Sequence, residues 1–270
     1  MKKIKLSRMV VYVFLTIVAF VSVFPFYWMV SGATNKSVEI IRGRMIPGFN
    51  LIENGKTLFK TIPILLGFFN SLKNAAIGTL GSLFICSMAG YGFQIYRSKA
   101  KDRVMSILLL SMMIPFAAVM VPLFRLISAL KLLNTTAGII LPGLSTAFLI
   151  FFFRQCSQSF PMEIVQAARV DGVGEFGIYV RVYFPIMAPT FAAAGIVSFM
   201  GVWNNYLWPL IVLQWESSRT LPILIAQLTQ GHVTDYGLLT LAITITTIPT
   251  MLIFITQQRR FVEGILGSVK

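Results

Sequence analysis

The stretch EIVQAARVDGVGEFGIYVRVYFP (residues 163–185) is a polar segment between two long hydrophobic runs of the sequence. The charged side chains in it and just before it are Arg154, Glu163, Arg169, Asp171, Glu175 and Arg181. A charge at the centre of a bilayer costs roughly 2.5–3.5 kcal/mol on the insertion scale. We therefore expect this segment to lie in water, beside a part of the chain that lies in lipid.

The rest of the sequence has the composition of a membrane protein. Hydrophobic residues make up 56% of the 270 positions and charged residues 12%, which is about half the usual charged fraction of a soluble domain. Uncharged runs long enough to cross a hydrocarbon core of about 30 Å as a helix occur at residues 10–35, 74–96, 104–124, 132–153, 182–213 and 236–258. Because lipid offers no water to backbone groups, each run is expected to be helical.

The predicted fold is an all-α membrane protein with six transmembrane helices in a single domain, residues 1–270. The predicted spans are about 10–33, 73–97, 103–126, 134–154, 186–213 and 236–257, with a cytoplasmic loop at 155–185 that holds a short helix. Prolines such as Pro115 and Pro189 lie in or beside these spans, where they tend to kink a helix. The first run is too long for a secretory signal and lacks a convincing cleavage site, so it is interpreted as a retained anchor.

The net charge of +14 is interpreted as topological, with no role in nucleic-acid binding. Basic residues flank the apolar runs, beginning with Lys2, Lys3, Lys5 and Arg8 before the first one. Cytoplasmic segments of membrane proteins carry an excess of Lys and Arg. With six spans, the bias predicts a multi-pass membrane protein with both termini in the cytoplasm.

The polar segment itself contains the start and stop signals of a short helix. Pro161 and Glu163 are typical of a helix amino terminus, and Gly172 is a natural stop. A helix of about ten residues is marginal in water, so something must hold it. Ala167 and Ala168 lack long side chains and would let it lie deep in a groove of another protein. The alternative is an amphipathic helix resting on lipid headgroups.

The stretch QAARVDGVGEFGIYVRVYFP resembles the cytoplasmic signature of membrane subunits of binding-protein-dependent ATP-binding-cassette (ABC) importers, which is EAA, three residues, G, nine residues, I-x-L-P. The positions of this signature are occupied here by Gln166, Ala167, Ala168, Gly172, Val182, Phe184 and Pro185. Glutamine replaces glutamate at the first, which removes a charge. The stretches GVWNNYLWPLIVL (201–213), TLPILIAQ (220–227) and QQRRFVEGILGSVK (257–270) are similar to the carbohydrate-importing branch of this family, the maltose-transporter type.

This resemblance implies a permease subunit of a prokaryotic inner membrane that works with several partners. They are a second, related but different permease subunit, two ATP-binding-cassette ATPase subunits inside and an extracytoplasmic sugar-binding protein outside. ATP and Mg would be held by the ATPases, and no cofactor is expected in this chain. The short helix would be the coupling helix that transmits ATPase closure. The predicted ATPase-coupling residues are Glu163, Gln166, Ala167, Ala168, Asp171 and Gly172.

Enzymatic chemistry is not expected in this chain. The tetrapeptide NGKT (54–57) resembles the end of a phosphate-binding loop, but the first glycine of that motif would fall at Asn50. The single histidine, His232, gives neither a metal site nor a catalytic pair. The six apolar runs contain no ionisable Asp, Glu, Lys, Arg or His, which argues against proton coupling. A self-contained sodium-coupled carrier is the alternative that remains open.

The fifth apolar run contains the candidate substrate path. Within six residues the sequence gathers aromatic and amide side chains, namely Trp203, Asn204, Asn205, Tyr206 and Trp208. Sugars present apolar C–H faces and many hydroxyl groups, and pockets that combine aromatic and polar side chains suit them. Trp and Tyr are also enriched at membrane–water interfaces, which is the alternative interpretation of this group.

Overall fold

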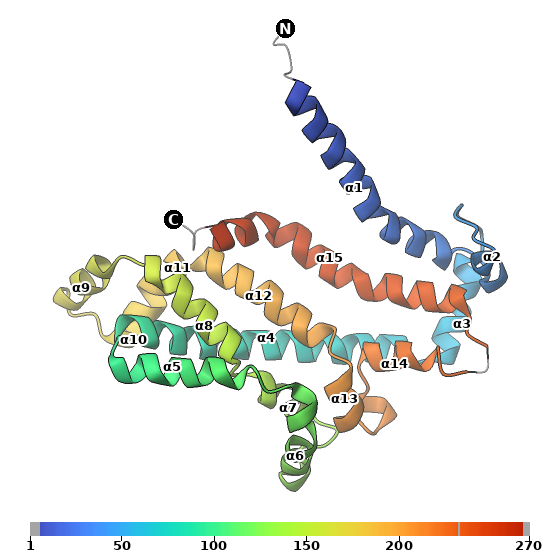
Figure 1. Ribbon diagram of the computed structural model, residues 1–270. Helices are drawn as coiled ribbons and strands as arrows, with labels where there is room; N and C mark the ends of the chain where they lie inside the picture. The colour runs from blue at the N-terminus through green and yellow to red at the C-terminus, as the bar shows by residue number, and fades with distance from the viewer. Residues whose placement is uncertain (1–5, 232, 267–270) are drawn as a thin grey trace. The chain divides into compact units, whose positions relative to one another are not determined.

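The computed structural model describes residues 6–231 and 233–266, and every regular element within them is a helix or helical turn (Figure 1). The predicted all-α class is confirmed. Lys2, Lys3, Lys5 and His232 lie outside the described residues, as do the last four residues of the stretch 257–270.

Fifteen α-helices follow one another along the described residues. They are α1 (Leu6–Ala33), α2 (Ser37–Ile41), α3 (Leu51–Thr61), α4 (Ile64–Ile95), α5 (Lys99–Ser111), α6 (Phe116–Ala129), α7 (Thr136–Ile140), α8 (Ala147–Cys156), α9 (Met162–Val170), α10 (Glu175–Ile178), α11 (Phe184–Ile186), α12 (Ala188–Trp203), α13 (Leu207–Val212), α14 (Leu221–Gln227) and α15 (Tyr236–Leu266). Short 3₁₀ turns follow α7 and α8 and precede α14, and a π-helical turn at Tyr179–Tyr183 joins α10 to α11.

Three helices are long and apolar enough to cross a membrane by themselves, and bent helix pairs bring the number to as many as six. The long ones are α1, α4 and α15. The pairs are Lys99–Ser111 with Phe116–Ala129, Thr136–Gly143 with Ala147–Ser159, and Glu175–Ile186 with Ala188–Trp203, bent by 98°, 50° and 83°. Each predicted span therefore has a helical counterpart, but three of them are not straight rods.

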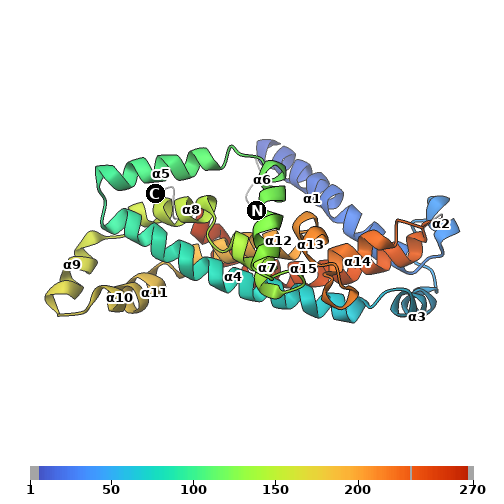
Figure 2. The same ribbon diagram turned by 90° about the horizontal axis from the view of Figure 1, so that it is seen from below.

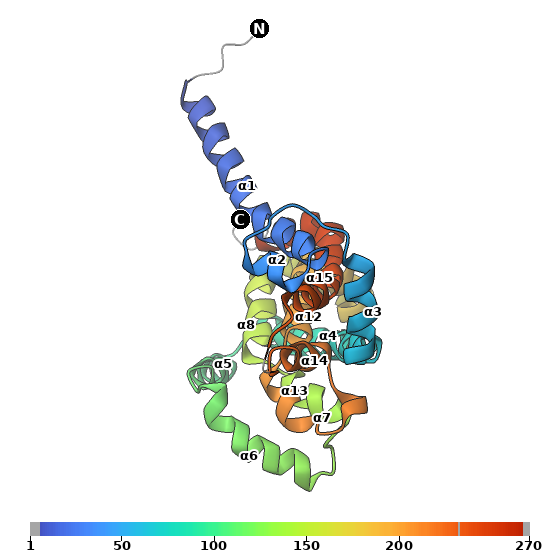
Figure 3. The same cartoon turned by 90° about the vertical axis from the view of Figure 1, so that its right-hand side faces the viewer.

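The sharpest of these bends lies in the run predicted at 103–126. Figure 3 shows α5 end-on while α6 runs across the view. Pro115 is the N-cap residue of α6, with extended backbone angles (φ −65°, ψ 139°). Proline has no N–H to donate to the preceding turn, and its ring obstructs helical geometry in the residue before it. The α5 helix therefore ends before Pro115 and a new helix begins after it.

The chain forms two compact units, and each contains segments from distant parts of the sequence. The first combines the described residues of Met1–Ile64 with Leu224–Ile248, and the second combines Leu65–Ile223 with the later part of α15. Because both units are discontinuous in sequence, neither is a separate sequence domain. The single membrane domain over 1–270 stays a prediction.

In the first unit, two buried asparagines hold the end of α1. Asn54 Nδ2 donates to the carbonyl oxygens of Ala33 (2.9 Å) and Asn35 (3.0 Å). Asn35 Nδ2 donates in turn to Ser31 O and Ile46 O, at 2.9 and 3.0 Å. The last carbonyl groups of a helix have no partner within it, so these side chains satisfy backbone groups where the chain leaves α1.

In the second unit, α4, α8 and α12 contribute to one apolar core. Phe153 of α8 and Cys86 of α4 are fully buried in it. The Phe153 ring lies 4.9 Å from that of Phe191 on α12. Cys156, also buried, is a free thiol like Cys86. This core extends towards the polar segment, because it includes Ile178 and Tyr183 from the chain that follows α9.

The close approach of α4 and α8 depends on Gly90. A Cβ atom at this position would lie 2.5 Å from Phe153 Cβ and 2.8 Å from Arg154 N. Small residues allow the backbones of membrane helices to pack this closely. Two residues later on α4, a Cβ at Gly92 would meet nothing within 4 Å, so the two glycines form a matched pair.

We predict that Gly90→Ala destabilises the protein while Gly92→Ala does not. Overpacking a tight contact costs about 1–3 kcal/mol, whereas alanine in an open helical position is favoured over glycine by up to about 1 kcal/mol. Thermal unfolding of the purified protein in detergent should give a lower midpoint for Gly90→Ala than for wild type, and an equal or higher one for Gly92→Ala. Equal midpoints for the two variants would contradict the packing described.

Candidate functional site

The helix expected in the polar segment is present as α9, and its ends lie where the sequence signals predict. Pro161 is its N-cap residue and Glu163 lies in its first turn. At its carboxyl end, Gly172 N donates to Arg169 O (3.1 Å) and Val173 N to Ala168 O (3.0 Å). These two bonds form a Schellman motif, in which the residue after the cap adopts left-handed backbone angles.

Gly172 provides that left-handed conformation, with φ +76°. A side chain at such an angle costs roughly 1–2 kcal/mol, and glycine carries no such penalty. A Cβ at Gly172 would meet nothing within 4 Å, so the requirement for glycine is conformational and not a matter of space. The glycine therefore fixes the direction in which the chain leaves α9.

The two faces of α9 differ in exposure. Val165 is fully buried and Ala168 is 9% exposed, and both belong to the apolar core of the second unit. The exposed side chains are those of Glu163, Ile164, Gln166, Ala167, Arg169 and Val170. Among the predicted coupling residues, Glu163, Gln166, Ala167 and Asp171 are thus free to meet another molecule, whereas Ala168 faces its own chain.

An ion pair closes the turn around Gly172. Arg169 Nε donates to Glu175 Oε1 (2.7 Å), and Nη2 donates to Oε2 (3.3 Å), so the pairing is bidentate. The Arg169 guanidinium lowers the pKa of Glu175 below its usual value, and a side-chain interaction with Tyr96 makes the next largest contribution. A lowered carboxyl pKa means that the pair persists at neutral pH and is lost only as the pH falls through that lowered value.

A second ionic cluster lies where the polar segment begins. Arg154, in the last turn of α8, pairs with Asp102 in the first turn of α5. Arg97 Nε lies 3.4 Å from the other oxygen of the same carboxylate. The Arg154 side chain is only 13% exposed, and a buried charge needs such a partner. Through Asp102, these ion pairs link Arg154, which precedes the polar segment, to Arg97 in the connection between α4 and α5.

The candidate substrate residues fall into two groups. Trp203, at the end of α12, is buried with its ring stacked 5.6 Å from that of Phe199. Trp208, in α13, is also buried, and its Nε1 donates to Gly138 O (3.1 Å). Both indole rings therefore pack within the chain. Composition alone did not distinguish this packing role from contact with a sugar.

The remaining three candidates lie at a break between helices. The α12 helix ends at Trp203 with Asn204 as its C-cap residue, and α13 begins at Leu207. Asn204 and Tyr206 are exposed, and Asn205 is half-buried. The predicted span at 186–213 is thus interrupted where its amide and phenol groups cluster. Of the five candidates, these three have side chains that are not buried within the chain, and contact with a sugar stays a prediction.

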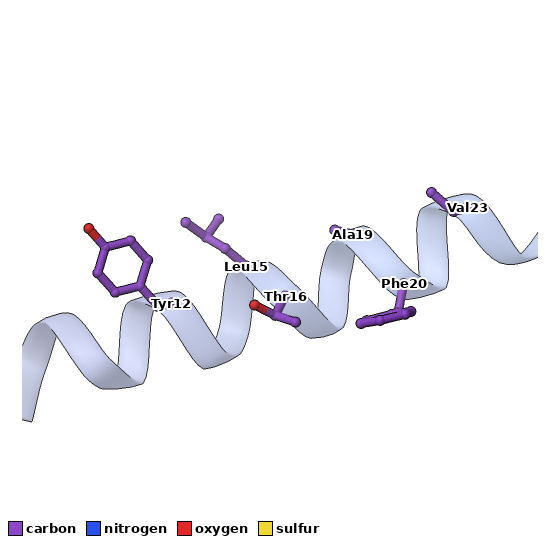
Figure 4. Close-up of a pocket in the computed structure, with 6 residues that line it drawn as sticks. All are labelled: Tyr12, Leu15, Thr16, Ala19, Phe20 and Val23. Atoms are coloured by element: carbon purple, nitrogen blue, oxygen red, sulfur yellow. The ribbon is translucent and has the colours of Figure 1, made fainter.

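The described residues offer no metal centre, since no group of three or more His, Cys, Asp or Glu side chains lies close enough together to hold an ion. An apolar hollow lies along α1 (Figure 4), lined by Tyr12, Leu15, Thr16, Ala19, Phe20 and Val23. All of these residues come from one helix, and Figure 4 shows their side chains along it. The hollow is the uncovered side of an apolar helix, as expected for contact with lipid or a membrane partner.

Residues 81–266 match the family model described as "Binding-protein-dependent transport system inner membrane component". The lactose transport system permease protein LacG of Rhizobium radiobacter is 46% identical over 98% of this chain and 97% of its own length. The arabinooligosaccharides transport system permease protein AraQ of Bacillus subtilis is 33% identical over 97% and 96%.

A solved structure shares the fold. A chain of a bacterial ABC transporter involved in the import of the acidic polysaccharide alginate superposes with a TM-score of 0.82, at 21% identity, over 95% of this chain and 97% of that one. The match to the family model covers more than half of the sequence and includes α9 and the break after α12. This chain therefore belongs to the family of inner-membrane components of binding-protein-dependent transport systems.

Proposed function

We propose that this chain is the permease subunit of an ABC importer and forms half of the translocation pathway for a sugar or oligosaccharide, driven by partner ATPases through α9. The observation that carries the proposal is the two-faced character of α9. Val165 and Ala168 attach the helix to its own chain, and the opposite face, with Glu163, Gln166 and Ala167, is exposed. A partner that displaces the exposed face of such a helix would also displace the apolar core that its buried face contacts.

The energy for transport comes, in this proposal, from ATP bound with Mg in two separate ATPase subunits. Moving a two-state equilibrium from 1:99 to 99:1 takes about 5.5 kcal/mol of differential binding. The outward face of α9 would lie in a cleft of an ATPase, and closure of that cleft would favour one state of the membrane helices. Ala167 would allow close approach, while Ala168 and Gly172 would support the helix and its end.

The remaining partners follow from the same family membership. A second, related but different permease subunit would complete the pathway, and an extracytoplasmic sugar-binding protein would deliver the substrate. Both termini and α9 would lie in the cytoplasm. The substrate class is inferred from relatives whose names specify lactose and arabinooligosaccharides. Lactose is the first probe to use, because the relative named for it is 46% identical.

Reconstitution distinguishes this function from a sodium-coupled carrier acting alone. Proteoliposomes that contain this chain with its second permease, its ATPases and its binding protein should accumulate radiolabelled lactose or an arabinooligosaccharide only when ATP is supplied. The chain by itself should move neither sugar under a sodium gradient, because energy coupling resides in the partners. Sodium-driven uptake by the chain alone would refute the proposal.

Ala167→Trp should block coupling, because a large side chain on the exposed face prevents close approach of the ATPase. Overpacking costs about 1–3 kcal/mol, so uptake should fall by about tenfold. The matched control is Ala100→Trp, since Ala100 is an exposed alanine in α5, outside the α9 segment. Both variants should reach the membrane in wild-type amounts, and ATPase co-purification should be lost only with Ala167→Trp. Wild-type uptake by Ala167→Trp would exclude docking at this face.

Asn204→Ala should slow translocation if the break after α12 contacts the sugar. Loss of one hydrogen bond costs about 0.5–1.5 kcal/mol, so the maximal uptake rate should fall about twofold to tenfold. The affinity of the separate binding protein for the sugar should not change. Gln155→Ala removes an exposed amide of α8 that bonds only to Gln158 among the described side chains and serves as the control. Equal rates for the two variants would assign the sugar contacts to other residues.

A further inference from the structure

Tyr96 lies between two cations that come from different parts of the chain. It directly follows α4, and its ring is approached by Arg169 of α9, with Cζ 5.6 Å from the ring centroid. Lys101 of α5 also lies over this ring, with Nζ 5.1 Å from the centroid. Cations within about 6 Å of an aromatic centroid are attracted by the negative charge of its face. One ring thus contacts both α9 and α5.

Each member of this cluster is held by a further contact. Arg169 is fixed by its bidentate pair with Glu175, and Lys101 Nζ donates to Gly92 O on α4 (3.1 Å). The ring of Tyr96 meets that of Tyr91 edge to face, with centroids 6.5 Å apart. Tyr91 is buried in the apolar core of the second unit. The Tyr96 ring is therefore attached to the core and is not a freely moving surface side chain.

The position of the cluster matters because α9 contacts its own chain mainly through small or medium apolar side chains. Val165 and Ala168 anchor its inner face through apolar packing, which is non-directional, whereas the contacts of Arg169 are directional. Figures 1 and 2 show α9 at the same end of the second unit as the connection between α4 and α5. The Arg169–Tyr96–Lys101 contacts join the carboxyl end of α9 to that connection.

We propose that Tyr96 is a positioning residue that holds the carboxyl-terminal turn of α9 against the junction of α4 and α5. Displacement of α9 is then passed through Arg169 to Tyr96 and from there to both helices. The aromatic face of Tyr96 carries this role, and its hydroxyl group adds an interaction with Glu175 and Arg169. The expected effect of Tyr96 on transport rests on the proposed coupling function of α9. The attachment of α9 to Tyr96 can be measured independently of transport.

Tyr96→Leu, Tyr96→Phe and Tyr236→Leu form the test series. Leucine removes the aromatic face, and phenylalanine keeps it. Tyr236 is a matched control because it is 40% exposed, the same fraction as Tyr96. In the full complex, stimulation of ATP hydrolysis by the sugar-loaded binding protein should fall about fivefold with Tyr96→Leu, which corresponds to about 1 kcal/mol. Tyr96→Phe loses only the interaction of the hydroxyl group with Arg169 and Glu175, so its stimulation should lie closer to wild type than to Tyr96→Leu. Tyr236→Leu should behave as wild type, and all variants should retain the ATPase subunits.

The attachment is measured by electron paramagnetic resonance between spin labels on Val170→Cys in α9 and Lys99→Cys in α5. Val170 is 88% exposed and Lys99 is exposed, while the native Cys86 and Cys156 are buried. The distance distribution should be narrow in the otherwise wild-type complex, broad with Tyr96→Leu, and closer to wild type than to Tyr96→Leu with Tyr96→Phe.

The outcomes separate this inference from the proposed function. An unchanged distance distribution and unchanged stimulation in Tyr96→Leu would overturn the positioning role. Loss of stimulation in Tyr96→Phe to the level of Tyr96→Leu would also overturn it, because the hydroxyl group would then be the essential part. If the wild-type complex transports no sugar with ATP, the proposed function fails, yet the distance measurement still decides whether Tyr96 holds α9.

Discussion

Burial of one side of α9 is the interaction on which the candidate site depends. A nine-residue helix is marginal in water, and α9 is ordered because Val165 and Ala168 lie in an apolar core. The core residues beneath it, such as Phe153 and Tyr183, come from α8 and from the π-helical turn after α10. The exposed side of α9 is therefore presented from a packed base, as the proposed docking of an ATPase requires.

The ends of this helix could be predicted from sequence because they depend on local chemistry. Proline at the start and glycine at the end act through their own backbone angles, and the structure begins and ends α9 next to Pro161 and Gly172. Which side of the helix is buried could not be predicted in the same way. Ile164 and Val165 are adjacent and similarly apolar, and only the surrounding core determines that Val165 is buried and Ile164 is 38% exposed.

Contacts between residues that are far apart in the chain could not be predicted from the sequence, for a related reason. Tyr96 and Arg169 are far apart in the chain, and nothing in the residues near either one indicates the other. The same holds for Trp203 and Trp208. Their aromatic character suits a sugar pocket, a membrane interface or a core, and the structure assigns them to the core through Phe199 and Gly138. The apolar runs were visible from composition, whereas the 98° bend between α5 and α6 depends on how the chain continues after Pro115.

The interruption after α12 has a consequence for the surroundings of that segment. Where a helix stops, its last carbonyl groups and the first amide groups of the next helix lack partners in the ladder. Hydrocarbon tails cannot satisfy such groups, so backbone of this kind is tolerated in a bilayer only beside protein or water. Within a bilayer, residues 204–206 would therefore have to face a hydrated or protein-lined space, where main-chain carbonyl groups without a helical partner can accept hydrogen bonds.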